Sequence, residues 1–114
     1  MLLASGVSGS NKLLKSAVVN PTETGTLISG VANRRIKVFA YKLVVSANIT
    51  VNFRDGAATA LEGPQDFAAK GGVVEFVTPP EYLFGTTAGN SLDLVVVGTG
   101  TVAGRVSYWN SDQD

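Results

Sequence analysis

The chain has 114 residues, enough for one domain with a single core. Its nine Lys and Arg balance its nine Asp and Glu, so there is no excess of positive charge for binding nucleic acid. It contains neither Cys nor His, which excludes disulfides, thiolate nucleophiles, the common zinc sites and Ser-His-Asp triads. We therefore expect a non-enzymatic protein without catalytic, cofactor-binding or metal-binding residues and without a small-molecule substrate.

The composition favours strands and turns. Val, Thr and Ile occur 16, 10 and 3 times, and Gly occurs 13 times. No segment has the apolar periodicity of a helix, and no apolar run approaches the length of a membrane span. About eight short strands are expected. The candidate segments, in chain order, are residues 14–19, 25–29, 36–47, 48–54, 61–67, 73–77, 82–84, 92–97 and 101–109.

Three of these segments carry more detailed predictions. Residues 36–47 are apolar on both faces and long for one strand, which indicates a bulge or a central place in a sheet. In residues 48–54, Ile49, Val51 and Phe53 alternate with polar residues, as in a half-buried strand. The polar break at 46–48 and the glycines at 98–100 predict tight hairpins into the strands that follow them.

Together these elements predict an all-β, single-domain antiparallel fold, either a β-sandwich or a jelly roll. The boundaries we expect are an N-terminal arm at 1–12, the sandwich at 13–110 and a C-terminal tail at 111–114. The arm combines small polar residues with apolar ones at its start, a pattern suited to ordering on a partner or on a neighbour's sheet edge. We therefore take Leu2, Leu3 and Val7 as interface candidates.

A longer pattern resembles small β-sandwich proteins encoded among the structural genes of tailed bacteriophages. Its segments are RRIKVFAYKLVVSANITVNFRDG, EGPQDFAAKGGVVEF and EYLFGTTAGNSLDLVVVGTGTVAGRVSYW, within about residues 34 to 109. The positions that match the family pattern are mostly turn glycines and core apolar residues: Gly63, Ala68, Gly71, Gly72, Thr86, Gly89, Leu92, Leu94, Gly104, Val106 and Tyr108.

The resemblance implies an antiparallel β-sandwich of the jelly-roll type. It also implies a homotrimeric decoration, or cement, protein on the outer surface of a phage capsid. Such a protein stabilises the head by bridging subunits of the major capsid protein, which would be its partner, and it binds neither nucleic acid nor membrane. The alternative is a receptor- or carbohydrate-binding module of a tail fibre or baseplate. That alternative draws on the aromatic group Tyr82, Phe84, Tyr108 and Trp109, because sugar-binding modules stack aromatic rings on sugars.

Trp109 lies on the same strand face as Arg105, opposite Val106 and Tyr108. It is therefore expected either at a subunit interface or under another part of the fold, and Trp109 and Arg105 complete the interface candidates.

Two other signals have ordinary explanations. Residues 98–103 match the dinucleotide-binding fingerprint G-x-G-x-x-G/A, but the alternation that follows them predicts a strand where that fingerprint requires a helix. The acidic residues Asp55, Glu62, Asp66, Glu75 and Glu81 have no spacing that singles out a catalytic pair. We expect these carboxylates to be solvated side chains on loops and strand exteriors.

Overall fold

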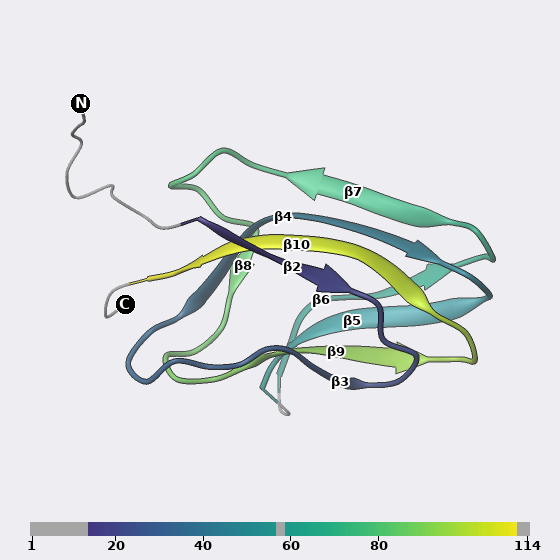
Figure 1. Cartoon of the computed structure of the whole chain (residues 1–114), viewed down its shortest axis with the longest axis horizontal. Helices are drawn as coiled ribbons and strands as arrows, with labels where there is room; N and C mark the ends of the chain where they lie inside the picture. Colours follow the sequence, from purple (N-terminus) through teal and green to yellow (C-terminus); the bar gives the residue numbers. More distant parts are fainter. Residues whose placement is uncertain (1–13, 57–58, 112–114) are drawn as a thin grey trace.

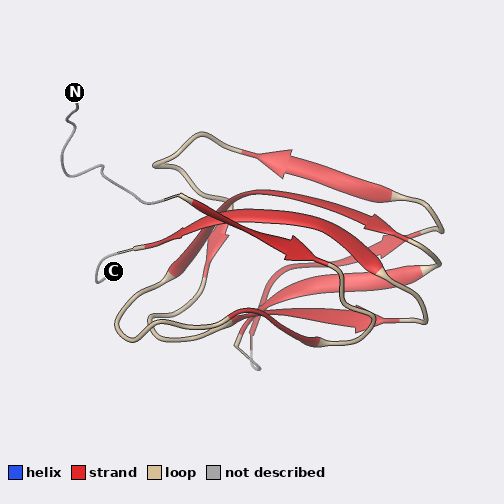
Figure 2. Ribbon diagram, viewed as in Figure 1, coloured by secondary structure: helices blue, strands red, loops and turns tan. Residues whose placement is uncertain are grey.

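The computed structural model describes residues 14–56 and 59–111, which form two antiparallel sheets packed face to face (Figure 1). Nine strands and no helix occur in these residues (Figure 2). The all-β sandwich predicted from the alternation is thus confirmed. The arm at 1–12 and residues 112–114 lie outside the described residues, whereas Ser111 is buried and exchanges hydrogen bonds with the backbone of Arg35.

The first sheet has the strand order β2-β10-β4-β7. These strands are β2 (Lys15–Val19), β10 (Val102–Asn110), β4 (Ile36–Val45) and β7 (Gly72–Phe76). A two-residue strand, β8 (Phe84–Gly85), also pairs with β4. The sheet edges are therefore β2 on one side and β7 on the other.

The second sheet has the order β3-β9-β5-β6. Its strands are β3 (Gly25–Ile28), β9 (Leu92–Val97), β5 (Ile49–Asp55) and β6 (Thr59–Phe67). Leaving the short β8 aside, successive strands alternate between the two sheets except for β5 and β6, which pair directly. This interleaved order is that of a jelly roll, in which the two sheets close one common core.

The two predicted hairpins are wrong. Strand β4 lies in the first sheet and β5 in the second, and β9 and β10 are likewise in different sheets. Each short connection crosses from one sheet to the other instead of turning back beside its own strand. Turn residues such as Gly98 and Gly100, which have positive φ angles, favour a sharp reversal in either case, so they do not distinguish the two arrangements.

The predicted irregularity in the long apolar segment is confirmed. Ser107 pairs with Ala40 but Tyr108 pairs with Val38, so Phe39 is the extra residue of a bulge in β4. Strand β4 is also central, between β10 on one side and β7 with β8 on the other. The bulge shifts the alternation, so that Val38 and Tyr41 both face the core.

The core lies between the sheets and is formed by alternate residues of the strands. Ile49, Val51 and Phe53 are buried, as their alternation predicts. The ring of Phe53 lies 5.0 Å from the rings of both Tyr41 and Phe84. These contacts join the two sheets and thereby determine which face of each sheet remains outside.

Candidate interaction surface

The outer face of the first sheet is the side directed away from the core. Its residues follow from the strand register, which aligns Val18, Arg105, Lys42 and Val74 in one row across four strands. A second row aligns Ser16, Ser107, Ala40 and Phe76, while Val44 lies beside Ala103 and Gly72. We call this set the outer face.

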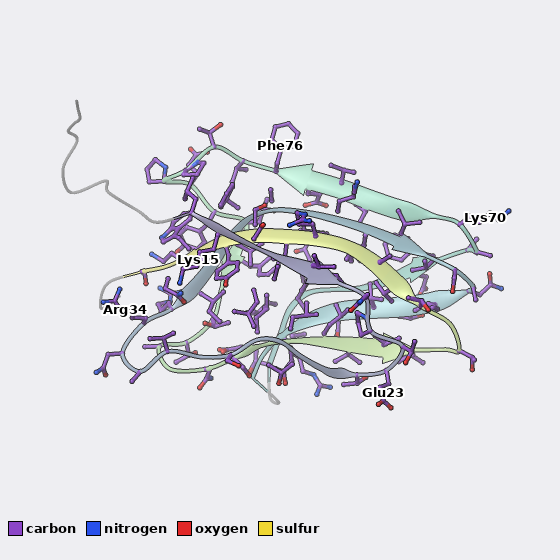
Figure 3. All side chains as sticks on the ribbon, in the orientation of Figure 1. Lys15, Glu23, Arg34, Lys70 and Phe76 are labelled. Atoms are coloured by element: carbon purple, nitrogen blue, oxygen red, sulfur yellow. The ribbon has the colours of Figure 1, made fainter. Side chains whose placement is uncertain are left out.

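The outer face is unusually apolar for an exposed surface. Val18, Val74 and Phe76 are 61%, 64% and 74% exposed, and Val44 is 45% exposed. Figure 3 shows the ring of Phe76 projecting from the end of β7, away from the body of the sandwich. Contiguous apolar side chains on a solvent-exposed sheet face are typical of a surface that another molecule covers.

A shallow groove crosses this face. It has a volume of about 420 Å³ and lies between β7, β4 and β10, with Val74 and Phe76 on one side and Arg105 and Ser107 on the other. Lys42 and Arg105 are cross-strand neighbours within it, and Arg105 Nη1 donates a hydrogen bond of 3.0 Å to Ser16 Oγ. The groove therefore combines apolar walls with two cationic residues and one acidic residue, Glu75. The two cations fit a partner with apolar residues and a carboxylate.

The opposite sheet presents a more polar exterior. Thr50, Asn52 and Arg54 alternate with the buried residues of β5, and Thr50 Oγ1 donates a 2.6 Å hydrogen bond to Asp66 Oδ1. Val97 is exposed on this exterior, but the residue aligned with it on β5 is the polar Thr50. The two sides of the sandwich thus differ in character, and the first sheet has the better interaction surface.

Trp109 is packed within the fold and not exposed for a partner. It is 1% exposed, and its ring contacts Phe39 at 5.9 Å and Tyr82 at 6.2 Å between centroids. Lys37 Nζ in turn lies 4.7 Å from the centre of the Tyr82 ring. Of the two placements expected for Trp109, the structure has the one in which another part of the fold covers it.

The other interface candidates lie in different parts of the chain. Arg105 is exposed and lines the groove. Leu2, Leu3 and Val7 lie outside the described residues. In the aromatic group, Phe84 is buried along with Trp109, so these four residues do not form an exposed stacking platform of the kind that sugar binding requires.

Three of the five carboxylates considered for catalysis have structural hydrogen bonds. Asp66 bonds to Thr50, and Tyr41 Oη donates to Glu62 Oε2 at 3.2 Å. Gln65 Nε2 donates to the same Tyr41 oxygen at 3.2 Å. Burial raises the pKa of Tyr41 to about 12, assisted by the negative charge of Glu62 and partly opposed by the hydrogen bond from Gln65. This cluster links β4 to β6 across the sandwich.

Asp55 is the third, and it fastens the loop between β8 and β9 to the end of β5. Its carboxylate accepts hydrogen bonds from Thr87 N at 3.0 Å, Thr87 Oγ1 at 2.6 Å and Asn90 Nδ2 at 3.0 Å. Partial burial acts to raise the pKa of Asp55, but these bonds and the nearby Arg35 outweigh it and lower that pKa. Because both oxygens of this carboxylate accept hydrogen bonds from the β8–β9 loop, the role of Asp55 is structural.

The structure gives no support to the dinucleotide fingerprint. Residues 98–101 connect β9 to β10, so a strand follows the glycines and no helix N-terminus is present for a pyrophosphate. In the described part of the chain, no group of His, Cys, Asp and Glu side chains is arranged to hold a metal ion. Nor does any helix in residues 14–56 and 59–111 have the length and apolarity to cross a membrane.

Sequence reasoning missed Val18, Val44, Val74 and Phe76 as surface residues. The signal was that apolar residues occur on both parities of β7, as Val73, Val74 and Phe76. A strand of that kind is buried on both faces or has an exposed apolar face. Only the assembled sandwich shows that one face of β7 is uncovered.

Comparisons with known proteins identify no family. No protein-family model matches the chain, and searches of curated proteins and of solved structures give no match either. Of what the resemblance to phage structural proteins implies, the β-sandwich fold is the part that the structure confirms.

Proposed function

We propose that this chain is a non-enzymatic structural protein of a tailed-bacteriophage particle, a decoration protein that binds the outside of the capsid. In this role it bridges major capsid protein subunits and stabilises the head. The observation that carries the proposal is the outer face, where Val44, Val74 and Phe76 are exposed as neighbours on β4 and β7 and Val18 is exposed at the other edge of the same sheet. The jelly-roll order and the sequence resemblance support it.

The mechanism requires no covalent chemistry. A shell subunit that covers the outer face removes apolar surface from water, at about 25 cal/mol per Å². Lys42 and Arg105 select a partner segment that has a carboxylate opposite them, which fixes the orientation of the bound protein. Because the protein binds only the assembled shell, binding shifts the equilibrium toward the assembled shell by mass action. A homotrimer is the assembly that the resemblance implies, and it is part of the proposal.

The test compares two valine substitutions on opposite sheets. Val44→Glu places a charge on the outer face, and Val97→Glu places the same charge on the exterior of the second sheet. Each protein is added to phage particles that lack the decoration protein, and the amount bound and the temperature of genome release are measured. We expect wild type and Val97→Glu to bind and to raise the release temperature, whereas Val44→Glu binds at least about tenfold more weakly.

Two results would count against the proposal. If Val44→Glu binds particles as strongly as wild type does, the outer face does not contact the shell. If particles with and without bound protein release the genome at the same temperature, the protein binds the particle but does not stabilise it.

A further inference from the structure

Among the described strands, the sheet edge at β7 has few of the features that normally prevent strand pairing between molecules. The two sheets end in β2, β7, β3 and β6, and natural proteins protect such edges with charges, prolines, bulges or very short strands. Strand β2 begins with Lys15, and β3 has four residues and a register shift. Strand β6 contains Pro64, two register shifts and two acidic residues.

Strand β7 has no proline, bulge or register shift in its five residues. It pairs regularly with β4 over Gly72–Phe76 and lies at the margin of the sandwich with no described strand beyond it (Figure 1). Its one charged residue, Glu75, is aligned with Tyr41 on the face opposite Val74. Apart from Glu75, which lies on the inner side of the sheet with Tyr41, the edge is therefore apolar, regularly paired and exposed at Val74 and Phe76.

The backbone groups on this open edge follow from the ladder. Val77 N donates to Phe39 O at 2.8 Å, and Val45 N donates to Gly71 O at 2.9 Å. Odd-numbered residues of this segment thus bond to β4, and alternation directs the N–H and C=O groups of Gly72, Val74 and Phe76 away from it. These three residues can bond to another strand while the side chains of Val74 and Phe76 remain on the outer face.

We propose that the occupant of this edge is β7 of a second copy, paired antiparallel about a two-fold axis at Val74. This register overlaps all five residues of both strands. Val74 then faces Val74 of the other copy, and each Phe76 faces a Gly72, so the largest side chain lies opposite a residue with none. Each Glu75 faces a Val73, which keeps the two like charges off directly opposed positions.

The pairing satisfies about six backbone hydrogen bonds, because all three outward-directed residues of each strand take part. It also joins the two outer faces into one continuous sheet surface, with the apolar side chains of Val74 and Phe76 from both copies at its centre. The inference goes beyond the proposed function, since it concerns contact between copies and not contact with a shell. A two-fold contact does not close a trimer, so a trimer would use a different surface.

The first test uses the absence of native cysteine. In the proposed register, the Cα atoms of the two Val74 residues lie about 5.5 Å apart, within the range that a disulfide spans. The two Phe76 residues, which at 74% are at least as exposed as Val74 at 64%, are separated by on the order of 14 Å along the strands. We expect Val74→Cys to form a disulfide-linked dimer rapidly under mild oxidation and Phe76→Cys to form little. Equal rates for the two variants, or no dimer from Val74→Cys, would overturn the proposal.

The second test measures association without a crosslink, by sedimentation velocity of the full chain. Val74→Lys protects the edge with a charge, and Val18→Lys places the same charge in the same row at the other edge of the sheet. We expect wild type and Val18→Lys to form species of twice the 11.8 kDa chain mass, and Val74→Lys to associate at least about tenfold more weakly. Equal association of all three proteins refutes the β7 contact, and the particle-binding test with Val44→Glu is judged separately.

Discussion

The ring of Tyr82 meets the indole of Trp109 edge-on, with centroids 6.2 Å apart and ring planes at 89°. Tyr82 lies in the segment between β7 and β8, whereas Trp109 is near the end of β10. The contact closes the outer side of the first sheet at this end, beside Phe39. An edge-to-face pair of this kind stabilises the fold beyond its buried area.

Replacing Tyr82 by alanine is therefore expected to expose Trp109. Since Trp109 is the sole tryptophan, its fluorescence reports this site directly. We expect the emission to shift to longer wavelength, quenching by iodide to increase, and the free energy of unfolding to fall by about 1–2 kcal/mol. Wild-type emission should not change with protein concentration, and a blue shift on self-association would show that a subunit contact also covers Trp109.

Tyr41 predicts a loss of stability at alkaline pH. Its pKa is raised from 10.0 in the unfolded chain to about 12 in the fold. A raised pKa means that the folded state holds the proton more tightly than the unfolded chain does. The contribution of Tyr41 to the free energy of unfolding is therefore complete below pH 10 and is lost as the pH rises from 10 to 12.

The variant Tyr41→Phe should lack that part of the pH dependence and the corresponding absorbance change of an ionising phenol. At neutral pH it should be about 1 kcal/mol less stable than wild type, because the hydrogen bonds to Glu62 and Gln65 are lost. Parallel stability curves for the two proteins from pH 9 to 12 would contradict this explanation.

Asp55 predicts a dependence of the opposite sign at acid pH. Its pKa lies below the ordinary 3.8 in the fold, so its contribution is complete above that value and disappears as the pH falls through the lowered pKa. Asp55→Asn removes the charge, and we expect a loss of about 1 kcal/mol at neutral pH together with a weaker acid dependence. The matched control is Asp66→Asn, because the carboxylate of Asp66 accepts a hydrogen bond from Thr50. This variant should lose less stability than Asp55→Asn. Urea titrations at several pH values measure both losses.

Removing residues 1–10 tests the expected arm separately from the sandwich. Strand β2 begins at Lys15 and all nine strands lie beyond the deletion, so the melting temperature should change little. If Leu2, Leu3 and Val7 contact a partner, binding to particles or assembly of the trimer should decline. Undiminished binding and assembly by the shortened protein would exclude a role for these three residues.

The sequence alone determined the strands, because side-chain alternation is a local property. Ile49, Val51 and Phe53 share a face whenever the backbone is extended, and the long segment over β4 had to contain an irregularity or lie centrally. The absence of Cys and His excludes whole classes of site whatever the fold, because no arrangement of the chain can supply a side chain that it lacks. The number and spacing of the strands predicted a β-sandwich or a jelly roll.

Only the tertiary structure decided which strands pair and which apolar residues stay exposed. The turns at 46–48 and 98–101 allow either a hairpin or a crossing between sheets, and the choice depends on contacts made by distant strands such as β2 and β7. In the same way, Trp109 and Val74 both lie on the outer side of the first sheet, yet Phe39 and Tyr82 cover Trp109 while Val74 is 64% exposed. Burial is a property of the assembled chain, because it depends on which segments pack over a residue, and the periodicity of one strand contains no information about its neighbours.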